Sequence, residues 1–228
     1  MLAPQQIQGG GPWYAETRIT DDLIVEPWNS FSSLALIFPA VYFLWKIRKD
    51  PMQFKFLLLC IPLLFANGLG STLFHGLRSS RFFLTMDYMP AFFLTLLITA
   101  YLWIKVLPKW WMGIGVMGLV FATRWGAFAV FGGQFSINAS YAIGGLAFLI
   151  PLLLLIRKTE YQFVKQIVIV VISFLLALYF RGVDKDFIDT IPFGTHFLWH
   201  IFSGIGAFFL ADFLYKFRLN ELKLKEST

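Results

Sequence analysis

The chain has 228 residues, of which 58% are hydrophobic, 19% aromatic and only 14% charged. A soluble domain usually carries about 25% charged residues, so this composition excludes a water-soluble enzyme. The net charge of +6 at pH 7 is typical of the basic loops that orient a membrane protein, and we expect no nucleic-acid partner. The single cysteine, Cys60, excludes a disulfide framework and a cysteine-rich metal site.

Seven apolar stretches, separated by charged or turn residues, are candidates for bilayer spans, each of which needs about 20 residues as a helix. They are Ser30–Ile47, Gln53–Leu77, Leu84–Ile104, Trp110–Val130, Ala139–Ile156, Phe163–Phe180 and Thr195–Tyr215. The sequence therefore predicts an all-α membrane protein, a bundle of seven transmembrane helices. We expect a polar N-terminal segment over residues 1–29, a transmembrane domain that holds the catalytic site over residues 30–216, and a tail over residues 217–228.

Basic residues predict the orientation of this bundle. Most of the 19 Lys and Arg residues fall in the C-terminal tail and in the loops on the same side of the bundle as that tail. The positive-inside rule places this side in the cytoplasm, so we expect the N-terminus outside and the C-terminus in the cytoplasm. The compact loops favour a bacterial inner membrane over a eukaryotic ER or Golgi membrane for this multi-pass protein.

Polar side chains gather at one depth of the predicted bundle. The three histidines of the chain, His75, His196 and His200, all lie in expected spans, and the last two are four residues apart. That spacing places them on one face of a helix. With the expected orientation, Ser71 and Asp87 fall at the same outer level as the histidines. Ionisable groups at membrane depth are costly and mark functional sites.

These residue types suit metal-assisted hydrolysis. Three imidazoles from two helices can hold Zn²⁺ and leave a fourth position for water, which becomes a nucleophile near neutral pH. Asp87 could accept the proton of that water, and the Ser71 hydroxyl could stabilise a developing oxyanion. The residues alone leave a second interpretation open, in which the histidines bridge helices by hydrogen bonds and Ser71 bonds to the carbonyl four residues earlier.

Three motifs in chain order carry a resemblance to a known family. They are EPWNS at residues 26–30, GSTLFH at residues 70–75 and GTHFLWH at residues 194–200. Together with Asp87 they resemble the alkaline ceramidases, which belong to a wider superfamily of seven-span membrane hydrolases and receptors.

The resemblance implies zinc held by His75, His196 and His200, with Ser71 and Asp87 close by. It implies hydrolysis of the amide bond of ceramide or a ceramide-like membrane lipid, which gives a sphingoid base and a fatty acid. Two alternatives stay open: a zinc lipid esterase or phospholipase of the same superfamily, and a receptor-like seven-span protein with a structural zinc.

The resemblance also raises the question of a calcium site, because animal alkaline ceramidases carry one ahead of the first span. Trp13, Glu16 and Glu26 resemble parts of that site. Pro12 and Thr17 depart from it, because they stand where oxygen-donating side chains are expected, and this departure puts calcium regulation in doubt.

Three aspartates complete the candidates. Asp21 and Asp22 could supply replacement oxygen ligands, since calcium takes six to eight of them. Asp184, just before the last expected span, resembles an aspartate of the ceramidases, and the sequence assigns it no role.

Overall fold

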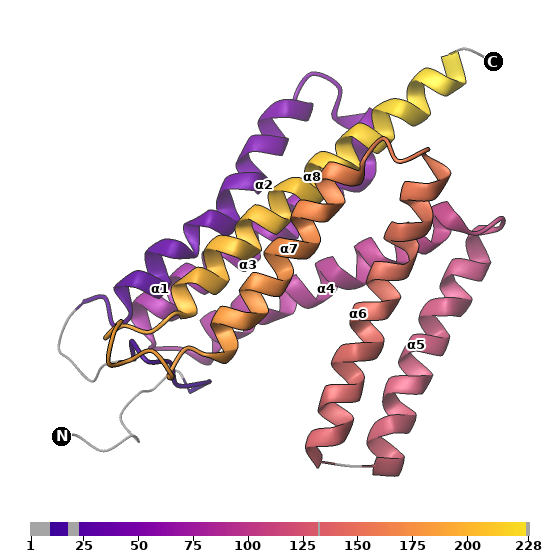
Figure 1. The fold of residues 1–228 in the computed structure, drawn as a ribbon. Coiled ribbons are helices and arrows are strands. Elements are labelled where there is room, and N and C mark those ends of the chain that lie inside the picture. The colour runs from indigo at the N-terminus through magenta and orange to yellow at the C-terminus, as the bar shows by residue number, and fades with distance from the viewer. Residues whose placement is uncertain (1–9, 18–22, 132, 227–228) are drawn as a thin grey trace. The chain divides into compact units, whose positions relative to one another are not determined.

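The computed structural model describes residues 10–17, 23–131 and 133–226, and within these ranges every regular element is a helix. Most of the helices are joined by short connections, and residues 183–195 form a longer one between α7 and α8 (Figure 1). They are α1 (Pro27–Ser32), α2 (Leu34–Ile47), the short 3-10 helix η2 (Pro51–Phe54), α3 (Lys55–Leu77), α4 (Arg81–Val106), α5 (Trp110–Phe131), α6 (Gly133–Lys158), α7 (Val164–Gly182) and α8 (His196–Glu226).

A long helix overlies each of the seven expected spans. Among the described residues, six helical segments are long and apolar enough to cross a membrane: Pro27–Ile47, Pro51–Leu77, Arg81–Val106, Trp110–Phe131, Val164–Gly182 and His196–Glu226. The helix over the fifth expected span, α6, is not one of the six, and several of its side chains lie outside the described set. The all-α class is confirmed and these helices indicate a multi-pass membrane protein, whereas the number seven stays a prediction.

The chain divides into two compact units. The first comprises residues 1–94 and 165–228 and therefore contains all three histidines; the second comprises residues 95–164. In the first unit, α2 packs against both α3 and α8. The core of this packing consists of Ala40, Phe43, Ile47, Phe54, Leu57, Ile61, Leu64 and Ala211.

Two glycines let these helices approach closely. A Cβ on Gly68 of α3 would lie 2.9 Å from the backbone nitrogen of Ile37, and one on Gly204 of α8 would lie 2.7 Å from the carbonyl carbon of Ala35. Both Ile37 and Ala35 belong to α2. Small residues at such crossings are typical of helix contacts in membranes. The close crossings bring the N-terminal part of α8 and the C-terminal part of α3 to the same end of α2.

In the second unit, α5 packs against α6. Arg124 interrupts the fourth expected span, and its Nε donates a hydrogen bond to Ser140 Oγ at 2.6 Å. The indole of Trp103 donates to the carbonyl oxygen of Ala147 at 2.8 Å. Interhelical hydrogen bonds of this kind satisfy polar side chains at membrane depth.

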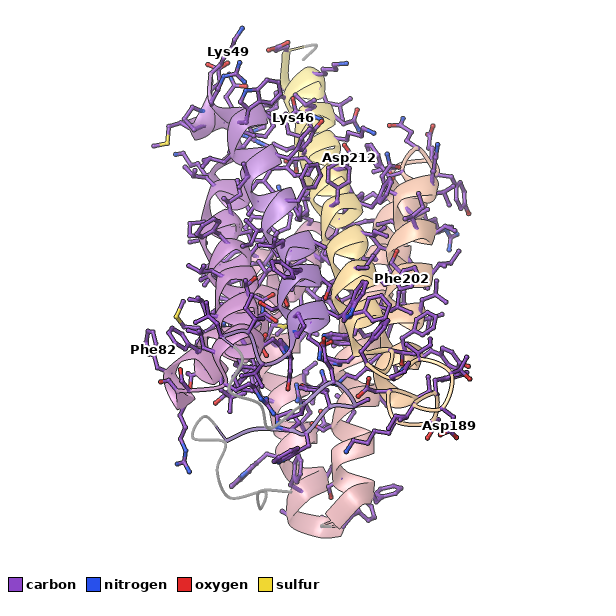
Figure 2. The ribbon with its side chains drawn as sticks, turned by 90° about the vertical axis from the view of Figure 1, so that its left-hand side faces the viewer. Lys46, Lys49, Phe82, Asp189, Phe202 and Asp212 are labelled. Atoms are coloured by element: carbon purple, nitrogen blue, oxygen red, sulfur yellow. The ribbon has the colours of Figure 1, made fainter. Side chains whose placement is uncertain are left out.

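The last helix extends well past its expected end at Tyr215 and continues to Glu226. Its polar extension is stabilised by side-chain pairs about one turn apart. Lys216 Nζ lies 2.7 Å from Asp212 Oδ2, and Arg218 Nη1 lies 3.2 Å from Glu221 Oε2. Figure 2 shows Asp212 and Lys46 at one end of the first unit and Asp189 at the other.

Candidate metal centre

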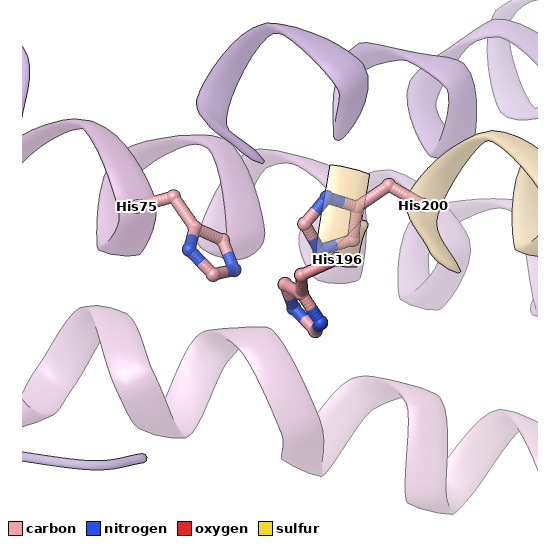
Figure 3. Close-up of side chains that lie close together, drawn as sticks. All are labelled: His75, His196 and His200. Atoms are coloured by element: carbon pink, nitrogen blue, oxygen red, sulfur yellow. The ribbon is translucent and has the colours of Figure 1, made fainter. Parts of the chain in front are cut away.

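The three histidines converge in the interior of the first unit. His75 comes from the last turn of α3, while His196 begins α8 and His200 follows one turn later. The side chains face one another in Figure 3, and one ligand nitrogen from each lies within 4.8 Å of the other two. All three residues are buried, so water does not fully solvate their ring nitrogens. Within the described part of the chain, this trio is the group of His, Cys, Asp and Glu side chains that could hold a metal ion.

Neighbouring side chains fix the His200 ring. Its Nδ1 lies 2.9 Å from Ser32 Oγ and 3.2 Å from Ser33 Oγ. Each of these hydroxyls donates its own proton to the carbonyl oxygen of Asn29, at 3.1 Å from Ser32 and 2.7 Å from Ser33. The serine oxygens therefore accept the Nδ1 proton of His200, which leaves the lone pair on Nε2 available for a metal.

Glu26 fixes the His75 ring in the same way. The Nδ1 proton of His75 is donated to Glu26 Oε2, and Nε2 of His75 is buried without a hydrogen-bond partner. Nδ1 of His196 is likewise buried and unpartnered. A buried polar atom without a partner is costly, and a carboxylate behind a histidine is the usual support of a metal ligand. These orphaned nitrogens and the all-imidazole donor set fit a divalent metal such as zinc.

The charge on Glu26 suits this support. Burial pushes the pKa of Glu26 upward, but the hydrogen bond with His75, the charge of Arg78 and the hydroxyl of Thr17 outweigh burial and hold that pKa below its ordinary value. Thr17 Oγ1 donates to Glu26 Oε1 at 2.6 Å. The carboxylate is therefore ionised at neutral pH and polarises the His75 ring.

Ser71 and Asp87 lie next to each other beside the histidines. The Ser71 hydroxyl donates a hydrogen bond to the Asp87 carboxylate, which also feels the charge of His75. Ser71 Oγ lies 3.0 Å from Ser33 Oγ, one of the His200 supports. The next residue, Thr72, makes the contact with a carbonyl four residues earlier: its Oγ1 donates to the carbonyl oxygen of Gly68 at 2.8 Å. Ser71 is fully buried and Asp87 only half-buried, so Asp87 is the more accessible of the pair.

Two comparisons bear on the identity of this site. The family model described as Ceramidase matches residues 18–227, which include the three histidines, Ser71 and Asp87. The chain belongs to the ceramidase family. A search of the curated proteins found no match. Membership implies a hydrolase that acts on the amide bond of ceramide, and among the described residues the buried histidine trio could hold a metal ion.

Asp184 has a role that the sequence did not indicate. Its carboxylate accepts hydrogen bonds from the backbone N–H groups of Thr195 at 2.9 Å and His196 at 2.8 Å, and from that of Ala15 at 2.8 Å. Gly194 has a φ of +68°, and a Cβ there would collide with both Asp184 and Ala15. Asp184 therefore caps the start of α8, where the first metal ligand stands, and ties the N-terminal segment to it. Asp184 lies 12 residues before His196, too far to be read as a local N-cap, so no sequence pattern signals this contact.

Tyr14 is a second residue of the site that the sequence did not indicate. Its ring stacks on His196 with centroids 3.7 Å apart and an interplanar angle of 20°, and its centroid lies 5.2 Å from that of His75. Burial raises the pKa of Tyr14 to about 12, so the phenol keeps its proton. The N-terminal segment thus forms one wall of the histidine site, and no sequence pattern signals this contact.

The residues that resemble parts of a calcium site have different roles in the structure. Glu16 accepts the backbone N–H of Trp28 at 2.7 Å and that of Asn29 at 2.8 Å, so it caps α1. Burial raises the pKa of Glu16 in spite of these two hydrogen bonds. Glu26 supports His75, and Trp13 is 38% exposed. Asp21 and Asp22 lie outside the described residues.

Proposed function

We propose that the chain is a zinc-dependent membrane amidase that hydrolyses ceramide or a ceramide-like lipid to a sphingoid base and a fatty acid. The observation that carries the proposal is the buried trio of His75, His196 and His200, in which Nε2 of His75 and Nδ1 of His196 lack hydrogen-bond partners, next to the Ser71–Asp87 pair. When bound, zinc supplies Lewis acidity, which lowers the pKa of water and polarises a carbonyl.

The remaining chemistry falls to Asp87 and Ser71. The Asp87 carboxylate accepts a proton from the attacking water as the water oxygen bonds to the amide carbon. It then returns the proton to the amide nitrogen as the C–N bond breaks, so the amine leaves as the sphingoid base and the added oxygen stays in the fatty acid. The Ser71 hydroxyl donates to Asp87 before the reaction. Once Asp87 has taken up the water proton, this hydroxyl turns to donate a hydrogen bond to the oxyanion that forms on the carbonyl oxygen.

The proposed orientation places this site near the outer face of the membrane. We propose seven spans within residues 30–216, with α6 as the fifth, the N-terminus outside and the C-terminus in the cytoplasm. Lys46 and Lys49 lie at the end of the first unit opposite to Asp189 (Figure 2), which agrees with the positive-inside rule.

An aromatic cluster beside His196 supports lateral entry of a lipid. Trp28 is 51% exposed and stacks on Phe193 with centroids 4.6 Å apart, and Phe197 lies 5.8 Å from the Trp28 ring. Phe197 is the residue after His196, so this apolar surface adjoins the histidine trio. Hydrocarbon tails that cross such a surface bring the amide group to the level of the histidines.

The test is a metal analysis and a turnover assay on the same detergent-purified sample. We expect about one zinc per chain, and fatty-acid release from ceramide that stops with a chelator and returns with zinc. His196→Ala should lose both zinc and turnover. Asp87→Ala should keep most of the zinc and lose turnover by roughly 10²–10⁴-fold, the usual contribution of a general acid–base group. Asp189→Ala, on an exposed loop, is the control.

Four outcomes would contradict the proposal in different ways. Absence of zinc would leave the histidines as helix-packing groups. Zinc with ester turnover in place of amide turnover would favour a lipid esterase or phospholipase. Zinc with no turnover of either substrate class would favour a receptor-like protein with a structural metal, and normal turnover of Asp87→Ala would remove Asp87 from the reaction.

A further inference from the structure

Arg78 occupies an unusual backbone position at the end of α3. It follows Leu77, the last residue of the helix, and has φ 48° and ψ 24°, which is the left-handed conformation. Glycine normally stands at such a helix end, because a side chain is disfavoured there. A strained residue that persists points to a use for its side chain.

The side chain of Arg78 is a buried cation that makes one ion pair and one hydrogen bond, while its Nε and Nη1 lack hydrogen-bond partners. It is 2% exposed, and its Nε lies 3.2 Å from Glu26 Oε1. One terminal nitrogen donates to the carbonyl oxygen of Pro12 at 2.8 Å. The guanidinium also lies over the ring of Phe74, 4.6 Å from its centroid. The guanidinium therefore joins the N-terminal segment to Glu26.

Within the described part of the chain, the oxygen atoms around this cation do not form a calcium shell. Calcium takes six to eight oxygen ligands, whereas both oxygens of Glu16 accept backbone N–H groups of α1. One oxygen of Glu26 faces Thr17 and Arg78, and the other faces His75. Among the described residues, Asn29 Oδ1 is the buried side-chain oxygen without a partner, and it is a single neutral ligand.

We propose that Arg78 is the resident cation at Glu26, that it takes the place of a calcium ion in this ceramidase-family chain, and that it positions Glu26 behind His75. A guanidinium neutralises Glu26 and binds the Pro12 carbonyl, as a divalent cation would, but it is always present. Arg78 is a positioning residue, because it acts on the histidine site through Glu26. The proposal predicts that the protein neither binds calcium at this place nor depends on it.

The first experiment uses the unmodified full-length protein in detergent. Calcium is titrated by calorimetry, and thermal unfolding is followed by tryptophan fluorescence in calcium-depleted buffer with and without millimolar calcium. The buffer is depleted on a resin, because a soluble chelator would also withdraw zinc. We expect no saturable calcium isotherm and no shift of the unfolding midpoint. A one-site isotherm, or a midpoint that rises with calcium, would overturn the proposal without any need for a variant.

The second experiment tests the cation itself. Arg78→Gln should lower the unfolding midpoint by several degrees, because Glu26 loses its counter-charge and the Pro12 carbonyl loses its donor. The unfolding midpoint of Arg78→Lys should lie between those of the unmodified protein and Arg78→Gln. An ammonium group restores the charge but not the planar fork that contacts both acceptors. Arg81→Gln removes the same charge from an exposed position three residues on and is the matched control. Equal midpoints for Arg78→Gln and Arg81→Gln would contradict the proposal.

A third readout reports on the positioning of Glu26, and it alone rests on the proposed zinc site. Arg78→Gln should weaken zinc binding more than Arg81→Gln does, and Arg78→Lys should recover part of the loss. Equal zinc affinity of Arg78→Gln and Arg81→Gln would refute the positioning role. If the unmodified protein binds no zinc, the proposed function fails, while the calcium and stability results still decide whether Arg78 is the resident cation.

Discussion

Replacement of Asp184 by alanine is the most direct test of how the start of α8 is held. The carboxylate is 4% exposed and accepts three backbone N–H groups, two from Thr195 and His196 and one from Ala15. Asp184→Ala removes the acceptor for all three. The N–H groups of the helix start then lack a cap, and the N-terminal segment loses its bond to the loop.

The magnitude follows from the number and the charge of these bonds. A hydrogen bond to a charged group contributes about 1.5–3 kcal/mol, and loss of an N-cap alone costs about 1 kcal/mol. The low end of this range applies to each of the three bonds, because water can reach part of the exposed loop in the variant. Hydrogen bonds to that water restore part of the lost free energy. The expected loss is about 3 kcal/mol in the free energy of unfolding. Asp184→Asn keeps one acceptor oxygen, so its loss should be smaller.

The assay is denaturant unfolding in mixed micelles, followed by tryptophan fluorescence. Asp189→Ala, on the same loop but exposed, is the control and should stay within about 0.5 kcal/mol of the unmodified protein. If Asp184→Ala unfolds at the same denaturant concentration as the control, the capping role is refuted. An Asp184→Asn variant less stable than Asp184→Ala would also contradict the reasoning.

Three further predictions concern the same unit. Glu26→Gln should weaken zinc affinity roughly 10–100-fold, because the support of His75 loses its charge; competition with a coloured chelator measures this, and unchanged affinity would refute the support. Gly204→Ala should lower the free energy of unfolding by about 1–3 kcal/mol, because its Cβ meets the backbone of Ala35. Gly206→Ala meets nothing closer than 3.5 Å and serves as the comparison, so equal stabilities would show that the crossing is not tight. Removal of metal by a chelator should lower the unfolding midpoint and added zinc should restore it, whereas a midpoint indifferent to both would show that no metal links the helices.

The helices were predictable because apolar runs of span length leave few alternatives in the chain. The ends of the helices were less predictable. The expected last span stops at Tyr215, where charged residues begin, but α8 continues to Glu226 because Asp212, Lys216, Arg218 and Glu221 pair along its surface. Hydropathy reports where a helix would leave the membrane, and side-chain pairs decide where the helix ends.

The convergence of the histidines was predictable from chemistry and depth together. The i, i+4 spacing of His196 and His200 gives one face, and the expected topology adds His75 at the same level. Tyr14 and Asp184 were not predictable in the same way. Tyr14 acts by stacking and Asp184 by binding backbone N–H groups, so neither contact depends on a side-chain pattern that a sequence displays. Only the folded chain brings the N-terminal segment onto α8.

The ligands of the candidate metal centre come from two helices that lie far apart in the sequence. His75 belongs to α3, whereas His196 and His200 belong to α8, and the whole of the second unit is synthesised between them. A ribosome that makes this chain therefore releases one ligand early and the other two late. Throughout that interval a growing chain can offer a metal a single histidine, so the proposed loading of the site, and with it the proposed attack on membrane lipid, is deferred until α8 lies beside α2 and α3.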